Sequence, residues 1–184
     1  MNKRPIQTRN GLKALTALRS KLDAASSLEV IQEGGHLFQA HFTFNPPAEV
    51  EEVEELKRSL HMPLPFAYEQ FLLQCNGALL YYDDEYGQWG FDLYGTKDII
   101  PMNIECWKIF GDEWPPAYLL FARSRGDTDM LVLDTADFVN GRDCRVIDGE
   151  AIFSPRKWTR AARSFGDWLD RLIVAQGTKY WRWY

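Results

Sequence analysis

Two acidic clusters contain the residue types and spacings in this sequence that could do chemistry or recognise a partner. In one of them, Asp127 and Asp129 are separated by a single residue, and carboxylates at this spacing can hold a divalent cation. The alternative is a solvated hairpin turn, because Arg123-Ser124-Arg125-Gly126 precedes the pair and an apolar run follows it. A metal-assisted enzyme that uses Asp127 and Asp129 is therefore one hypothesis for the function, although we predict no metal site.

The other cluster mixes acidic and aromatic side chains. Asp83, Asp84 and Glu85 are followed by Tyr86 and Trp89, and no basic residue occurs from 83 to 92. Aromatic anchors with charges around them are typical of protein interfaces, although an ordinary charged loop has a similar composition. We predict that these five residues bind a partner, with Asp127 and Asp129 as further candidates.

The histidines and cysteines do not form a recognisable catalytic or metal-binding constellation. His36, His41 and His61 are far apart, and none has ligand-like spacing to a cysteine or a carboxylate. The sequence has no phosphate-binding loop, nucleophile elbow or dinucleotide fingerprint. Cys75 lies on the apolar side of an expected helix and is predicted to be a small buried hydrophobic residue. We therefore expect no catalytic residues and no cofactor, and we predict that the protein is not an enzyme.

Length and composition narrow the class of protein further. The chain has 184 residues, 46% of them hydrophobic, which suits one globular domain and excludes a disordered chain. Its formal net charge is −5, whereas a nucleic-acid-binding protein normally presents a basic surface, so a basic protein is the better-matched partner. Three scattered cysteines, no signal peptide and no membrane-spanning run predict a cytoplasmic protein that does not enter membranes.

Before residue 46 the pattern predicts a helix and a hairpin. Leucines at helical spacing indicate a helix over about residues 9–24. Residues 28–33 and 36–44 are then expected to form two strands joined by Gly34-Gly35, because glycines readily supply the positive φ angles of a tight turn. We predict that residues 1–45 form an N-terminal extension made of this helix and hairpin.

Two helices and a series of strands are expected next. Asn45-Pro46 is typical of a helix start, with Asn as the N-cap and Pro as the first helical residue, and predicts a helix to about Leu60. Another helix is expected to begin near Pro65 and to end at Asn76-Gly77. Short apolar or alternating runs predict strands at 79–82, 90–94, 118–122, 129–133, 144–147 and 151–153.

The end of the chain is predicted to form a helix and an aromatic tail. Asp148-Gly149 is expected to be the hairpin turn before the last strand. Ser164 is expected to cap an amphipathic helix that ends near Gly177. Residues 177–184 are expected to fold back over the sheet or the N-terminal helix, and the alternative is an exposed aromatic contact surface. Helices on both sides of a run of strands predict a single α+β domain with a mainly antiparallel, twisted sheet flanked by helices.

Several of these segments, in this order, resemble the SUKH superfamily. Leu64-Pro65, Tyr68, Phe71-Leu72 and Asn76-Gly77 are similar to its "LP…Y…FL…NG" signature. Further similar segments are Phe91 to Gly95, Leu120 to Asp134, and Ser164-Phe165 with Trp168-Leu169. The resemblance predicts a SUKH-like domain over residues 46–176, with 177–184 as an additional aromatic tail.

The resemblance also implies a class of activity. SUKH proteins include bacterial immunity proteins against toxins and fungal members linked to cell-wall signalling. We therefore predict an immunity protein that neutralises a cognate bacterial toxin, such as a nuclease, by direct binding. The alternative is an adaptor or regulatory module with several protein partners. The signature residues are expected to be scaffold, because each has a helix-starting, core or capping role.

Overall fold

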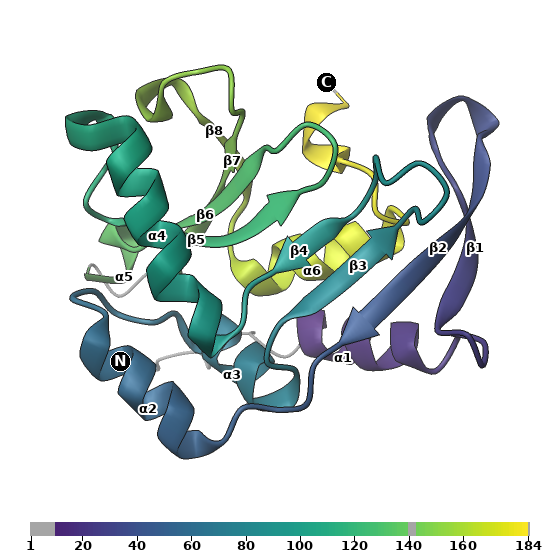
Figure 1. Ribbon diagram of the computed structural model, residues 1–184, viewed down its shortest axis with the longest axis horizontal. Helices are drawn as coiled ribbons and strands as arrows, with labels where there is room; N and C mark the ends of the chain where they lie inside the picture. The colour runs from purple at the N-terminus through teal and green to yellow at the C-terminus, as the bar shows by residue number, and fades with distance from the viewer. Residues whose placement is uncertain (1–9, 140–142, 184) are drawn as a thin grey trace, which may run out of the picture.

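The computed structural model describes residues 10–139 and 143–183. Its helices pack on one antiparallel sheet (Figure 1). The sheet has eight strands in chain order, and each neighbouring pair is antiparallel. The strands are β1 Ser27–Ile31, β2 Leu37–Phe44, β3 Ala78–Tyr82, β4 Phe91–Leu93, β5 Tyr118–Ser124, β6 Met130–Asp134, β7 Arg145–Gly149 and β8 Thr159–Ala162. This architecture confirms the predicted fold class.

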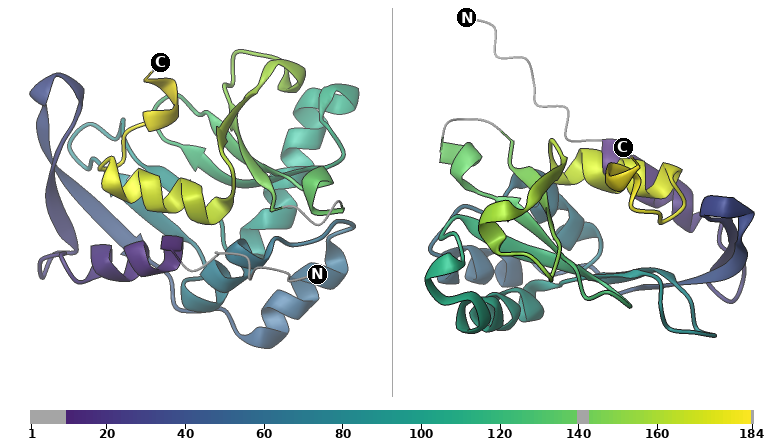
Figure 2. Two further views of the ribbon diagram at one scale, coloured as in Figure 1. Left: turned by 180° about the vertical axis from the view of Figure 1, so that it is seen from behind. Right: turned by 90° about the horizontal axis from the view of Figure 1, so that it is seen from above.

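Helices cover both faces of the sheet. The α-helices are α1 Asn10–Arg19, α2 Val50–Ser59, α3 Phe66–Gln74, α4 Thr96–Phe110, α5 Ala136–Val139 and α6 Phe165–Val174. Short 3-10 turns are η1 Glu33–Gly35, η2 Gly111–Glu113, η3 Pro155–Lys157 and η4 Tyr180–Arg182. Figure 2 shows α1 and α6 packed against each other on one face of the sheet, and α4 on the opposite face. No helix among the described residues is long and apolar enough to cross a membrane.

Strands β5 and β6 are buried on both faces, which explains their nearly continuous apolar sequence. Leu119 and Phe121 point into the main core under α6, where the Phe121 ring lies 5.1 Å from that of Trp168. Leu120, between them in sequence, joins a smaller core with Cys106 of α4. Successive side chains of a strand point to opposite faces, so a strand covered on both faces needs apolar residues at every position.

The N-terminal helix and hairpin are continuous with the rest of the sheet. Strand β2 pairs with β3, with Thr43 opposite Leu79, while α1 packs on α6. Gly34 and Gly35 make the hairpin turn with φ angles of +75° and +80°, as predicted from their lack of a Cβ atom.

Helix α2 begins later than Asn45-Pro46 predicts. Its N-cap is Glu49, which forms a capping box with Glu52. The preceding segment stays extended because its backbone bonds to other parts of the chain: Asn45 N–H donates to Gly77 O, and Ala48 N–H donates to Leu72 O. These long-range bonds override the local capping preference.

The turn predicted at Asp148-Gly149 is also wrong. Both residues lie inside β7, opposite Leu131 and Met130 of β6. The last strand is β8, Thr159–Ala162, and residues 151–153 belong to the connection between β7 and β8.

The sequence pattern does not predict helix α4, because Pro101 within it and several apolar residues on its exposed side hide the helical period.

The tail folds back over the sheet, as expected: the Trp181 ring lies 6.2 Å from the Phe91 ring and 6.4 Å from the Trp168 ring.

Candidate functional site

The loop between β3 and β4 presents most of the predicted partner-binding residues to solvent. Asp84 and Glu85 are exposed, as are the rings of Tyr86 (66%) and Trp89 (46%). Asp84 also forms an ion pair of 3.3 Å with His41 of β2, when that histidine is protonated. The loop is therefore an acidic and aromatic projection beside the sheet.

Asp83 has a different role from its neighbours, since it is only 5% exposed. One of its carboxylate oxygens accepts hydrogen bonds from the backbone N–H groups of Glu85 (3.0 Å) and Tyr86 (3.3 Å). Its backbone carbonyl accepts a further bond from Gly87 N–H. These bonds fix the loop conformation, so Asp83 shapes the surface formed by the following residues.

The turn between β5 and β6 packs directly against this loop. At Gly126, φ is +86° and a Cβ atom would lie 2.3 Å from the carbonyl oxygen of Gln88. Only glycine permits both this backbone conformation and this approach. The contact brings the two clusters predicted from the sequence, residues 83–89 and 127–129, to the same end of the sheet.

Asp127 and Asp129 are held by the C-terminal tail. Lys179 Nζ contacts the carboxylates of both residues, at 2.6 Å for Asp129. Asp129 also accepts a bond from Ala151 N–H at 3.0 Å and forms an ion pair with Arg182 at 2.8 Å.

Arg182 extends the same network to β7. Its guanidinium makes two bonds, 2.6 and 2.7 Å, to the carboxylate of Asp148, whose side chain is 2% exposed. Burial would lower the pKa of Arg182, but its bonds to Asp148 and Asp129 and the charges of these residues raise it above its ordinary value. The guanidinium thus compensates two carboxylates that lie largely out of water.

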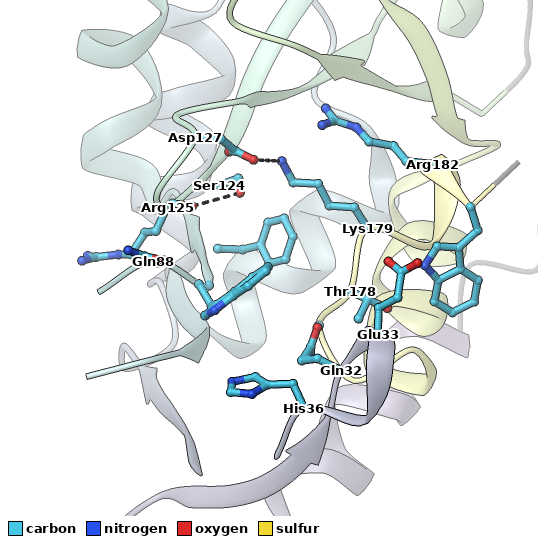
Figure 3. Close-up of a pocket in the computed structure, with 15 residues that line it drawn as sticks. Gln32, Glu33, His36, Gln88, Ser124, Arg125, Asp127, Thr178, Lys179 and Arg182 are labelled. Atoms are coloured by element: carbon cyan, nitrogen blue, oxygen red, sulfur yellow. Dashed lines mark hydrogen bonds and ion pairs between the residues drawn. The ribbon is translucent and has the colours of Figure 1, made fainter. Parts of the chain in front are cut away.

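A hollow of about 440 Å³ lies where these segments meet (Figure 3). Its lining comes from residues 32–36 at the hairpin tip, 88–91 of the β3–β4 loop, 124–127 of the β5–β6 turn and 177–183 of the tail. Trp89 and Asp127 of the predicted set line it, whereas Asp83, Asp84 and Glu85 do not. A volume of this order is within the range of ligand-binding clefts.

Acidic residues outnumber basic ones in the set formed by the lining of the hollow, its ion-pair partners and the β3–β4 loop. The charged residues that line it, pair with its lining or lie in the β3–β4 loop comprise eight acids and three bases, a formal charge of −5. They are Glu33, Asp83, Asp84, Glu85, Asp92, Asp127, Asp129 and Asp148, with Arg125, Lys179 and Arg182. Because the whole chain also carries −5, the remaining charged residues sum to zero.

Asp127 and Asp129 do not present a ready metal site. Both carboxylates contact the Lys179 ammonium, which occupies the place where a cation bridging them would bind. Among residues 10–139 and 143–183, no group of three or more His, Cys, Asp and Glu side chains is placed to hold a metal ion.

The cysteines are buried and free. Burial raises the pKa of Cys75 and Cys106, and raises that of Cys144 to about 12, so each thiol stays protonated at neutral pH. Protonated, buried thiols are poor nucleophiles and poor metal ligands. Their positions suit the structural role expected from the sequence.

The sequence reasoning missed two residues that define the hollow, Glu33 and Lys179. Each lies in a segment that bonds to residues far away in sequence: residues 31 and 32 bond to Gln176, and Lys179 bonds to Asp127 and Asp129. Neither residue belongs to a recognisable sequence motif. The available signal was charge: Lys179 and Arg182 are basic residues in a tail that otherwise consists mainly of aromatic rings.

A comparison with protein-family models matches residues 47–171 to the SMI1 / KNR4 family (SUKH-1), well over half of the chain. The chain belongs to this family. SUKH domains are known in immunity proteins and cell-wall regulators. A relative is an uncharacterized protein of Bacillus subtilis (strain 168), YnaB, which is 26% identical over 149 residues, 77% of this chain and 88% of the relative.

The residues that carry the SUKH resemblance lie mainly in the core of the fold. Tyr68, Phe71 and Leu72 are fully buried, and Tyr68 hydroxyl donates to Tyr94 O at 2.7 Å. The Asn76 side chain accepts a bond from Thr96 N–H at 2.7 Å and so links the end of α3 to the start of α4. These positions of the "LP…Y…FL…NG" signature build the scaffold, as predicted, and do not line the hollow, whereas the other resembling segments contribute Phe91, Ser124, Arg125 and Asp127 to its lining.

Proposed function

We propose that this SUKH protein is a non-catalytic immunity protein that neutralises a cognate bacterial toxin by binding it at the acidic hollow and the adjoining β3–β4 loop. The observation that carries the proposal is the β3–β4 loop, in which two exposed acids, Asp84 and Glu85, stand beside the exposed rings of Tyr86 and Trp89, in a chain of net charge −5. A toxin that acts on nucleic acid needs basic residues to hold phosphates, and this surface complements such a groove.

The exposed residues of the β3–β4 loop are proposed to make the direct contacts. Asp84 and Glu85 supply negative charge, while Tyr86 and Trp89 supply ring area for burial. Asp83 is proposed to act by fixing the loop, through its bonds to the backbone N–H groups of the following residues.

Asp127 and Asp129 are proposed to differ in the same way. The Asp127 side chain is 48% exposed and can meet a partner, whereas that of Asp129 is 10% exposed and holds the tail. Blocking a toxin in this manner requires no bond-making step from the immunity protein, since occupation of the substrate groove is sufficient.

A co-expression experiment tests this function. The tagged protein is used to isolate bound proteins from its native lysate, and each is then expressed alone and together with it. We expect one stoichiometric partner that is toxic alone and harmless in the presence of this protein. Several non-toxic partners would contradict immunity and support the adaptor alternative, in which the same surface serves endogenous proteins.

A charge-reversal variant tests the proposed surface. Asp84→Lys/Glu85→Lys changes two exposed side chains and is expected to abolish protection while leaving the melting temperature nearly unchanged. Glu55→Lys/Glu105→Lys is the matched control, because it makes the same charge change at exposed positions of α2 and α4. Equal loss of protection in both variants would show that only the overall charge matters and would remove the β3–β4 loop from the interface.

A further inference from the structure

We infer that the hollow is the receptor site for an arginine side chain that the partner protein presents in an exposed loop or helix. This inference rests on the proposed function for the identity of the partner, but the site itself follows from the lining of the hollow. The guanidinium would lie against the exposed ring of Trp89 or Trp183, with the carboxylates of Glu33 and Asp127 on the walls.

The shape and lining of the hollow suit a long, flat side chain. Its volume of about 440 Å³ leaves room for a whole side chain, and three aromatic residues line it. Phe91 is 2% exposed, whereas Trp89 and Trp183 are 46% and 51% exposed and leave ring area for a partner. An aliphatic stem with a planar cationic end can bury against such rings.

The ion pairs around the hollow favour a cation over an anion. Each basic residue of the lining already has a carboxylate partner: Arg125 pairs with Asp92 at 3.0 Å, Lys179 with Asp129 and Arg182 with Asp148. Those three pairs cancel in charge.

The lining has two acids, Glu33 and Asp127, and with the three neutral pairs set aside they leave a formal charge of −2. Glu33 has no ion-pair partner among the described residues, and the Asp127 side chain is 48% exposed although it contacts Lys179. Figure 3 shows Glu33 on the hairpin side of the hollow and Asp127 on the side of the β5–β6 turn. A cation that enters between these walls gains attraction from both, while an anion is repelled by both.

Arginine fits this site better than lysine for two reasons. Its guanidinium stacks on aromatic faces and is more weakly hydrated than an ammonium ion, so it loses less on entering an aromatic hollow. It also has five N–H donors in a fixed plane, which can bond to the two carboxylates of the lining.

An NMR titration tests the site without the partner. The probe is N-acetyl-arginine N-methylamide, added to the full-length, ¹⁵N-labelled protein, and the indole N–H signals of Trp89 and Trp183 are assigned with Trp89→Phe and Trp183→Phe variants. We expect both signals to shift in a saturable manner. The citrulline analogue has nearly the same shape without the charge, and we expect it to cause no saturable shift.

Two variants locate the binding within the hollow. Glu33→Gln is expected to weaken arginine-amide binding about two- to fivefold, as one partly exposed ion pair should. Glu29→Gln is the matched control, because Glu29 is exposed on the same hairpin but does not line the hollow. Equal binding of the arginine and citrulline analogues, stronger binding of a lysine analogue, or no effect of Glu33→Gln would each overturn the inference.

The two proposals fail separately. If the arginine probe binds as expected but no toxin is neutralised, the receptor site stands and the immunity function is wrong. If a toxin is neutralised but the probe leaves both indole signals unshifted, the immunity function stands and the arginine site is wrong.

Discussion

At the scale of single residues, Arg182 neutralises two largely buried carboxylates. Its guanidinium faces the carboxylates of Asp148 and Asp129, and these side chains are only 2% and 10% exposed. A buried carboxylate that loses its partner keeps the cost of desolvation without compensation. Arg182 is therefore central to the stability of the tail.

We predict that Arg182→Met lowers the free energy of unfolding by about 3 kcal/mol, the scale found when one partner of a buried ion pair is removed. Urea unfolding at neutral pH measures the change. The control is Arg160→Met, at an exposed position of β8, which is expected to change stability by less than about 0.5 kcal/mol. Similar values for the two variants would show that Arg182 does not compensate the buried acids.

The same network gives the protein a specific sensitivity to acid. Burial raises the pKa of Asp129, but bonds from Lys179 and Ala151 N–H and the charges of Lys179 and Arg182 outweigh this effect and lower it below 3.8. The folded state therefore binds this proton less readily than the unfolded state. The resulting stabilisation is present above the unfolded pKa, near 4, and is lost as the pH falls through the lower folded value.

We predict that the urea midpoint falls on acidification from about pH 6 to about pH 2.5, and that it falls less steeply in Asp129→Asn. The variant should be less stable than the natural protein at pH 6, since Lys179 and Arg182 lose a carboxylate partner. Parallel pH profiles for the two proteins would contradict this assignment.

At the scale of elements, α6 packs on the sheet and on two other helices. Its buried stripe packs on the sheet, on α1 and on α3, and the Trp168 ring lies 5.1 Å from Phe121 and 6.1 Å from Phe91. The helix starts at Ser164, whose hydroxyl accepts a bond from Asp167 N–H at 3.1 Å. It thus connects the family scaffold with the N-terminal helix.

We predict that Trp168→Ala lowers the free energy of unfolding by about 3–5 kcal/mol, because a large cavity would open in the core, and that Leu72→Ala costs about 2–5 kcal/mol for the same reason. Trp107→Ala, on the exposed face of α4, removes the same side chain from a 63% exposed position and is expected to cost less than about 0.5 kcal/mol. Thermal or urea unfolding compares the three variants. A loss at Trp107 equal to that at Trp168 would show that the face of α4 is covered in solution.

At the scale of the whole molecule, the charge is distributed unevenly. The hollow, its ion-pair partners and the β3–β4 loop together carry a formal −5, and the other charged residues sum to zero. An excess of acids over bases at one end of the sheet orients a basic partner during encounter, because the partner is attracted to that end. The effect acts on the association rate and weakens as salt screens the charges.

We predict that the association rate constant with the toxin falls about tenfold or more between low and physiological ionic strength, with a much smaller change in the dissociation rate. Surface plasmon resonance or stopped-flow fluorescence of the exposed tryptophans measures both rates. Asp84→Lys/Glu85→Lys should flatten the salt dependence. A salt effect confined to the dissociation rate would contradict steering by the acidic surface.

The sequence alone determined the features that depend on near neighbours. The glycine pair at 34–35, the cap at Ser164 and the buried stripe of α6 follow from backbone freedom, side-chain capping and helical period, and all three are found. The same holds for the scaffold residues that gave the family. Each of these features depends on interactions within a few residues, so it does not depend on how distant parts of the chain are arranged.

The tertiary structure decided which residues share a surface and which are exposed. Asp83 and Asp84 are neighbours with similar side chains, yet one is buried in bonds to its own loop and the other faces solvent. The hollow exists because a glycine turn approaches the β3–β4 loop and because Lys179 and Arg182 reach carboxylates 34–52 residues away in sequence. Ion pairs and backbone approach over such separations depend on the positions of all the intervening elements, and no local pattern in the chain records them.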